Sequence, residues 1–178
     1  MSLISQSLAV GTLVINLIIV FGVLFYGLKR IIGFELPQTA LRVQNKLKNY
    51  SLELSFSLAT VATAGSLYYS NMLGYEPCRM CWFQRIFMYP LVLILGIGIL
   101  FKDDNVTDYA LPLTMIGLPI ALYHALIQRY SQFQSSGCSV LSVSCSTEYT
   151  FHFGYITIPV MAFTAFLGIL ILLWRFKD

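Results

Sequence analysis

Five long apolar segments constrain the fold of this 178-residue chain more than any other feature. A helix that crosses a bilayer needs about 20 mostly apolar residues. The segments that meet this requirement are 8–28, 52–72, 82–101, 109–128 and 155–174. The connectors are short, and only 11% of the residues are charged, against about 25% in soluble domains. The sequence therefore predicts an all-α, multi-pass membrane bundle.

The distribution of basic residues predicts how the bundle is oriented. Eight of the eleven Lys and Arg residues lie in connector 29–51, at Lys102 or in the tail after residue 174. Cytoplasmic loops collect Lys and Arg, so we expect the N-terminus outside and the C-terminus in the cytoplasm. The basic residues form no phosphate-binding face, which argues against a nucleic-acid partner. We expect the apolar spans to contact membrane lipid instead.

The four cysteines all fall in the connectors that this orientation places outside, where disulfides persist. Cys78 and Cys81 form a C-x-x-C motif at the start of the third segment, and Cys138 and Cys145 lie between the last two. C-x-x-C is a common redox-active spacing, and a helix N-terminus lowers a thiol pKa. Six intervening residues let the second pair reach the Cα separation of a disulfide, about 4.4–6.8 Å. We predict that all four are catalytic and that both pairs are disulfide-bonded in the resting protein.

Other roles for these cysteines stay open. The pairs could be structural disulfides that staple loops. They could also bind or transport a soft metal such as Cu(I) or zinc, since Met80 lies between Cys78 and Cys81. No histidine lies in that loop and the second spacing is C-x6-C, so we assign no metal ligand. Haem attachment needs C-x-x-C-H, whereas Trp82 follows here.

Three polar residues lie in the outer halves of predicted spans. Arg85 is one helical turn beyond Cys81, His124 is the only histidine within a span, and Gln128 follows it by one turn. A cation within a membrane is costly, so Arg85 either reaches back to the headgroups or donates to an oxygen-bearing ligand. We predict that these residues line one pocket with the thiols. A quinone, either ubiquinone or menaquinone, is the expected electron acceptor, because it is flat and lipophilic and carries two carbonyl oxygens.

Residues 76–90, EPCRMCWFQRIFMYP, resemble the signature of the DsbB family of disulfide-bond-formation proteins, in particular its short BdbC-type branch. Residues 121–128, ALYHALIQ, are similar to the third-helix pattern of that family. Cys138 and Cys145 match its second, closely spaced pair. The resemblance covers about residues 51–178.

This resemblance implies a four-helix protein-dithiol:quinone oxidoreductase in the bacterial cytoplasmic (inner) membrane. It implies that Cys138 and Cys145 re-oxidise a DsbA- or BdbD-like thioredoxin-fold partner, that Cys78 and Cys81 reduce the quinone, and that Arg85 contacts the quinone. Vitamin K epoxide reductase relatives also couple loop cysteines to a quinone, but their C-x-x-C follows the loop pair.

The chain departs from the short branch at its N-terminus. Residues 1–50 add a fifth transmembrane helix and a basic connector to the core at 51–178. All predicted site residues follow residue 75, so we expect this extension to be dispensable for the chemistry.

Overall fold

The computed structural model describes residues 3–32, 42, 46–103, 105–130, 144–147 and 149–177. Most of the predicted basic connector lies outside these ranges. Cys138 lies outside them as well, so its predicted role is not addressed by the structure.

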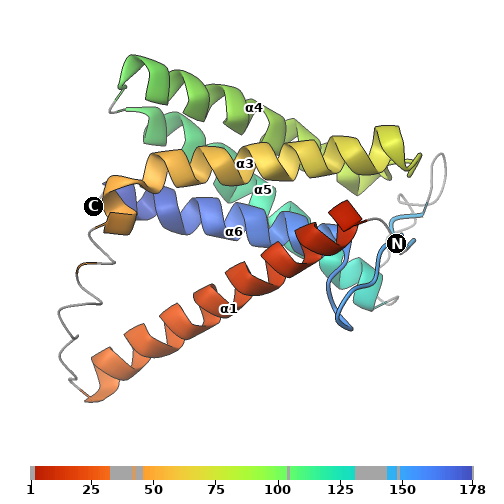
Figure 1. Ribbon diagram of the computed structural model, residues 1–178, viewed down its shortest axis with the longest axis horizontal. Coiled ribbons are helices and arrows are strands. Elements are labelled where there is room, and N and C mark those ends of the chain that lie inside the picture. Colours follow the sequence, from red (N-terminus) through yellow and green to blue (C-terminus); the bar gives the residue numbers. More distant parts are fainter. Residues whose placement is uncertain are drawn as a thin grey trace.

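Helices dominate the described part of the chain, where the loops contain one isolated β-bridge, between His152 and Ile156. Their bounds are α1 Leu3–Ile32, α3 Ser51–Leu67, η1 Tyr68–Met72, α4 Arg79–Phe101, α5 Val106–Arg129 and α6 Ile158–Lys177. The prediction of an all-α fold is confirmed, and each predicted apolar segment coincides with a helix (Figure 1).

Three of the described helices are long and apolar enough to cross a membrane: Leu3–Phe25 within α1, α4 and α5. Helix α6 contains a shorter apolar stretch, Ile158–Trp174. Helix α3 has 17 residues and continues directly into the five-residue π-helix η1. Short π segments are rare and concentrate at functional sites, and this one lies at the end of the bundle that carries the C-x-x-C motif.

Helices α3, α4, α5 and α6 form the bundle, with α3 and α5 each packed between α4 and α6. Its core centres on side chains fully shielded from solvent, including Leu91, Leu95 and Phe166. Helix α5 approaches α6 closely because Gly117 faces Phe166, whose ring occupies the place of a Cβ. The core therefore fixes α4 and α5, which carry Cys81, Arg85, His124 and Gln128.

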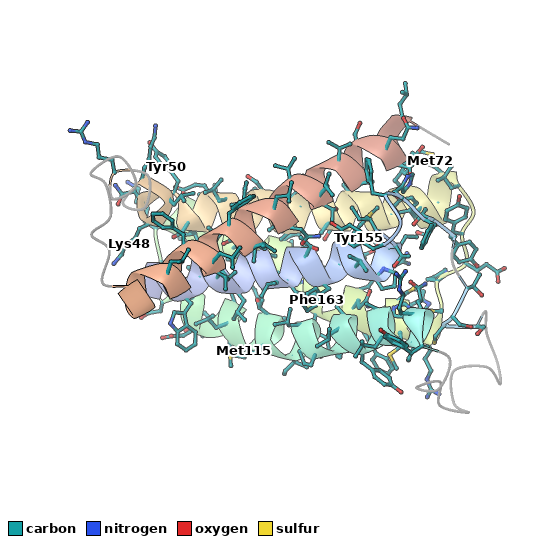
Figure 2. The ribbon with its side chains drawn as sticks, turned by 90° about the horizontal axis from the view of Figure 1, so that it is seen from below. Lys48, Tyr50, Met72, Met115, Tyr155 and Phe163 are labelled. Carbon is teal, nitrogen blue, oxygen red and sulfur yellow. The ribbon has the colours of Figure 1, made fainter. Side chains whose placement is uncertain are left out.

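Helix α1 lies across the outside of this bundle and packs mainly on α6 (Figure 1). Only 11% of its most apolar window is buried, against 39% for α5. Its N-terminal end lies beside the loops that precede α4 and α6, and its other end diverges from the bundle. Figure 2 shows Lys48 and Tyr50 at the opposite end of the bundle from Met72. The structure thus confirms an additional N-terminal helix.

Candidate redox site

Cys78 is the residue at which the backbone turns into α4. Its conformation is extended (φ −66°, ψ 171°), and its Sγ accepts a hydrogen bond from the backbone N–H of Cys81 at 3.4 Å. The sulfur thus takes the position that a Ser or Asp oxygen usually fills at a helix start. A helix N-terminus carries partial positive charge, so this location favours a thiolate.

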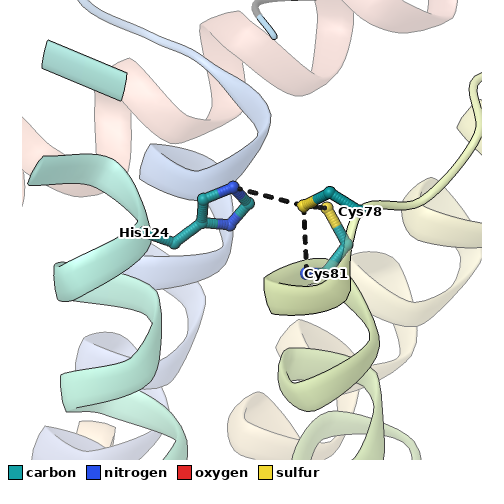
Figure 3. A group of neighbouring side chains, drawn as sticks. All are labelled: Cys78, Cys81 and His124. Atoms are coloured by element: carbon teal, nitrogen blue, oxygen red, sulfur yellow. Dashed lines mark hydrogen bonds between the residues drawn. The ribbon is translucent and has the colours of Figure 1, made fainter. Parts of the chain in front are cut away.

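The Cys78 and Cys81 sulfurs lie 3.0 Å apart as free thiols (Figure 3). The sequence predicts a resting disulfide here, and the structure differs by holding this pair in its reduced form. Cys145, in contrast, is disulfide-bonded, as predicted, and its predicted partner Cys138 lies outside the described residues. A dithiol at the head of α4 therefore lies near an oxidised cysteine.

His124 of α5 connects these two redox groups. Its Nε2 lies 3.5 Å from Cys78 Sγ and 3.2 Å from the carbonyl oxygen of Cys145. Its Nδ1 lies 3.1 Å from the amide nitrogen of Gln84. Because a carbonyl oxygen only accepts, Nε2 carries the hydrogen, and Nδ1 accepts from Gln84. The imidazole of His124 is thereby oriented as a donor toward Cys78 (Figure 3).

The contacts around Cys78 lower the pKa of its thiol to about 4. The largest cause is the hydrogen bond with the Cys81 thiol, and His124 adds a further hydrogen bond and a favourable electrostatic contribution. Burial opposes them, since Cys78 is only 4% exposed. In the reduced protein Cys78 is therefore a thiolate at neutral pH.

Cys81 faces a different environment, a cavity of about 220 Å³. Arg85, one turn further along α4, also lines this cavity. Its Nε and Nη2 donate to the hydroxyl and carbonyl oxygens of Ser66 at 3.0 and 3.2 Å, and its guanidinium lies 5.4 Å from the centre of the Trp82 ring. These two hydrogen bonds use two of the five N–H donors of a guanidinium. Arg85 is thus fixed at the cavity wall with donors to spare for a ligand.

Three tyrosines close the cavity at the loop end of the bundle: Tyr69, Tyr75 and Tyr149. The rings of Tyr75 and Tyr149 stack with centroids 4.6 Å apart, and Tyr69 stacks on Tyr75 at 6.0 Å. The Tyr149 hydroxyl donates to the carbonyl oxygen of Glu76 at 3.3 Å. Aromatic pairs of this kind stabilise by about 0.5–1.5 kcal/mol beyond burial, so they tie the loop before α6 to the loop before α4.

The sequence predicts one pocket for Arg85, His124, Gln128 and the thiols, and the structure separates them. Cys81 and Arg85 line the cavity, whereas His124 and Gln128 are not among its lining residues. His124 points to Cys78, and Gln128 donates from Nε2 to the carbonyl oxygen of Thr147 at 3.1 Å. The sequence places these residues at similar depths in α4 and α5, but it does not fix which neighbour each helix face points to. Arg85 of α4 faces the cavity, whereas His124 and Gln128 of α5 face Cys78 and the carbonyl oxygen of Thr147.

Sequence reasoning missed two further groups at this site. Gln84 and Ser66 orient His124 and Arg85, and neither residue type stands out in an apolar helix. Helix α1 also contributes to the cavity wall. The cavity beside Cys81 is therefore not confined to the last four helices.

Cys78, Cys81 and His124 also form a possible metal-binding group. Their ligand atoms lie within 4.8 Å of one another. Sulfur and imidazole ligands of this kind suit zinc or copper.

A buried, activated C-x-x-C at the head of one helix in a membrane bundle defines a membrane thiol oxidoreductase. Comparison with known proteins agrees, because the model of the family "Disulfide bond formation protein DsbB" matches residues 49–176. The chain belongs to this family, as the sequence resemblance predicts.

Several bacterial relatives match over most of their own length. "Disulfide bond formation protein C" of Bacillus subtilis (strain 168) is 44% identical over 126 residues, which are 71% of this chain and 91% of the relative. "Probable disulfide formation protein C 1" of Bacillus anthracis is 43% identical with the same coverage. "Probable disulfide formation protein C" of Halalkalibacterium halodurans is 45% identical over 72% of this chain and 93% of the relative. No solved structure matches the chain.

These findings define the protein as a multi-pass membrane protein of the disulfide-forming oxidoreductase class. Family membership also sets aside the vitamin K epoxide reductase alternative.

Proposed function

We propose that the protein oxidises a thioredoxin-fold dithiol partner and passes the electrons to a membrane quinone, ubiquinone or menaquinone. The observation that carries this proposal is the different surroundings of the two C-x-x-C sulfurs. Cys78 belongs to one buried cluster with Cys145, and Cys81 packs against that cluster, but of the two only Cys81 lines the cavity beside Arg85. Both cysteines therefore adjoin the second redox group, and Cys81 alone also borders a space for an acceptor.

The exchange steps follow from this placement. The partner dithiol reduces the Cys138–Cys145 disulfide and becomes a disulfide itself. A thiolate of the reduced loop pair attacks Cys78 in the Cys78–Cys81 disulfide and releases the Cys81 thiolate toward the cavity. The second loop thiolate then attacks the mixed disulfide, which restores the loop disulfide and frees Cys78. Re-forming the Cys78–Cys81 disulfide delivers two electrons to the quinone, which takes up two protons to become the quinol.

The lowered Cys78 pKa supplies part of the driving force. Stabilising one thiolate of a dithiol stabilises the reduced form and makes the corresponding disulfide more oxidising. The α4 N-terminus and the donors Cys81 and His124 stabilise Cys78 in this way. The Cys78–Cys81 disulfide is thereby poised to accept electrons from the loop pair.

The cavity has the chemistry that a quinone ring requires. Its walls are mainly aliphatic and aromatic, and Arg85 provides a charged donor next to Cys81. Arg85 would hold a quinone carbonyl oxygen through a charge-assisted hydrogen bond. The fixed position of its guanidinium on Ser66 reduces the entropy lost on binding.

We further propose that the cysteine loops face the extracytoplasmic side of the bacterial cytoplasmic membrane. The N-terminal end of α1 lies at the same end of the molecule as these loops, and Lys48 lies at the other (Figures 1 and 2). This arrangement agrees with the location of most basic residues in predicted cytoplasmic connectors.

Soft-metal binding is the second candidate function, favoured by the grouping of Cys78, Cys81 and His124. Metal analysis of the purified, reduced protein tests it. One tightly held zinc or copper per chain that blocks alkylation of Cys78 and Cys81 would support it, and retention of alkylation with no metal would refute it.

Anaerobic mixing of the purified protein with a reduced thioredoxin-fold partner and a quinone tests the main proposal. We expect one quinol per partner disulfide formed, measured by absorbance and by alkylation of residual thiols. Partner oxidation without quinol, or no oxidation in the presence of quinone, would contradict it.

A further inference from the structure

Helix α1 lies outside the region that the family model matches, yet it borders the cavity that contains Cys81 and Arg85. Its residues on the cavity wall are Ser7, Leu8, Gly11, Thr12 and Ile15. They recur about one helical turn apart, so one stripe of α1 faces the cavity while much of its remaining surface is exposed.

A polar anchor holds the N-terminal turn of α1 on the loop end of the bundle. The Ser5 hydroxyl lies 2.9 Å from Nε2 of His152 and 3.1 Å from the hydroxyl of Tyr69. Ser5 and Tyr69 are each 4% exposed, and Tyr69 itself lines the cavity. Leaving such buried polar groups unpaired is unfavourable, so these hydrogen bonds favour one docked position of α1.

Two further contacts fix α1 along the rest of the cavity. The Thr164 hydroxyl of α6 donates to Oδ1 of Asn16 at 2.9 Å. On the side of α3, Leu8 packs so closely that a Cβ on Gly65 would lie 3.2 Å from Leu8 Cδ1. Contacts with both α3 and α6 place the Ser5–Asn16 part of α1 over the junction of these helices.

We propose that α1 is a fifth wall of the quinone site and that the space at Gly11 sets how well a lipophilic quinone is held. This inference rests on the proposed function. Gly11 lines the cavity, and a Cβ built on it meets nothing within 4 Å. The first atom of a larger side chain at position 11 would therefore enter open space at the cavity wall without overlapping the protein.

Substitution of Gly11 by Ala, Leu and Phe tests the proposal, with the same series at Gly22 as the matched control. A Cβ at Gly22 also meets nothing within 4 Å, and Gly22 does not line the cavity. Both glycines lie inside α1, where each replacement has a higher helix propensity than glycine. Neither series should disrupt the helix.

The measurements are quinone and partner KM values and equilibrium binding of a short-chain quinone analogue to the full-length protein. We expect the Gly11 series to weaken quinone binding progressively, by at least about 10-fold for Gly11→Phe, since one extra or missing methylene in an apolar pocket changes discrimination by about 10- to 200-fold. The partner KM and the whole Gly22 series should stay at wild-type values.

The outcomes separate this inference from the proposed function. Wild-type protein that neither binds nor reduces a quinone would contradict the proposed function itself. Wild-type activity with identical quinone affinity in Gly11→Phe and Gly22→Phe would overturn only the role of α1. Equal losses in both series would also overturn it, because they would indicate a general effect of bulk on the helix.

Discussion

Cys78 and Cys81 lie three residues apart, yet they occupy contrasting environments. Cys78 is buried in a cluster with Cys145, whereas Cys81 packs against that cluster, is partly exposed and also lines a mainly apolar cavity beside Arg85. The first environment stabilises a thiolate and adjoins a second redox group. The second has space for a flat acceptor. The contrast shows how a single turn of helix can separate thiol exchange from electron delivery to a lipid-soluble acceptor.

The largest expected effect comes from removing either sulfur. Cys78→Ser and Cys81→Ser should each reduce quinol formation to the uncatalysed rate, because a two-electron transfer from a dithiol needs both sulfurs. Steady-state quinol absorbance with a reduced partner measures this effect. Met80→Leu, which alters the residue between them, should keep substantial activity. Full turnover by either serine variant would eliminate the proposed division of roles.

Arg85→Gln should weaken quinone use by about 10- to 150-fold, because a charge-assisted hydrogen bond contributes about 1.5–3 kcal/mol. The loss should appear in the quinone KM and leave the partner KM near its wild-type value. Arg129→Gln is a suitable control, since Arg129 donates to the carbonyl oxygen of Gly154 away from the cavity. Unchanged quinone kinetics in a folded Arg85→Gln variant would show that Arg85 does not bind the quinone and only hydrogen-bonds Ser66 within the fold.

The pH dependence of thiol alkylation tests whether the surroundings of Cys78 stabilise its thiolate. A thiolate exists above its pKa, so a Cys78 pKa of about 4 predicts an alkylation rate of the reduced protein that stays flat from pH 6 to 8. His124→Ala removes one donor and should raise the midpoint of the profile by about 1 to 2 pH units. Alkylation can be followed by peptide mass spectrometry. A profile that His124→Ala leaves unmoved would show that His124 does not stabilise the thiolate.

Gln84→Leu should have the smallest effect of this series. Its amide orients His124 through Nδ1 without touching either sulfur, and a neutral hydrogen bond contributes about 0.5–1.5 kcal/mol. We expect the Cys78 pKa to rise less than in His124→Ala, with alkylation at low pH slowed by about 2- to 13-fold. Gln84→Glu, which retains an oxygen acceptor but lacks the amide donor, should not restore the wild-type profile. A shift larger than that of His124→Ala would indicate a contribution beyond orienting the imidazole.

The helices and the C-x-x-C location could be predicted from the sequence because local signals determine them. Apolar length predicts the spans and places the C-x-x-C motif at the head of the third one, although α4 begins at Arg79 and not at residue 82, so that Cys81 lies in its first turn. The separation of His124 from Arg85 could not be predicted, because it depends on the rotation of α5 against α4. That rotation is set by packing across the core, including the approach of Gly117 to Phe166.

The contribution of α1 to the cavity wall could not be predicted from the sequence for a different reason. Its docking depends on pairs far apart in the sequence, such as Ser5 with His152 and Asn16 with Thr164. Single serines, threonines and asparagines in an apolar helix are common and carry no signal of their partners.

Disulfide trapping tests the central claim, that Cys78 serves the loop pair and Cys81 the quinone, most directly. In Cys81→Ser, Cys78 keeps its place beside Cys145. Without any reduced partner, its thiolate should attack the oxidised Cys138–Cys145 pair, so that a disulfide between Cys78 and one loop cysteine accumulates and the other loop cysteine is released as a thiolate. In Cys78→Ser, the corresponding disulfide of Cys81 should not accumulate. Non-reducing peptide mass spectrometry identifies both species. Equal trapping of Cys81 and Cys78 by the loop cysteines would contradict the account.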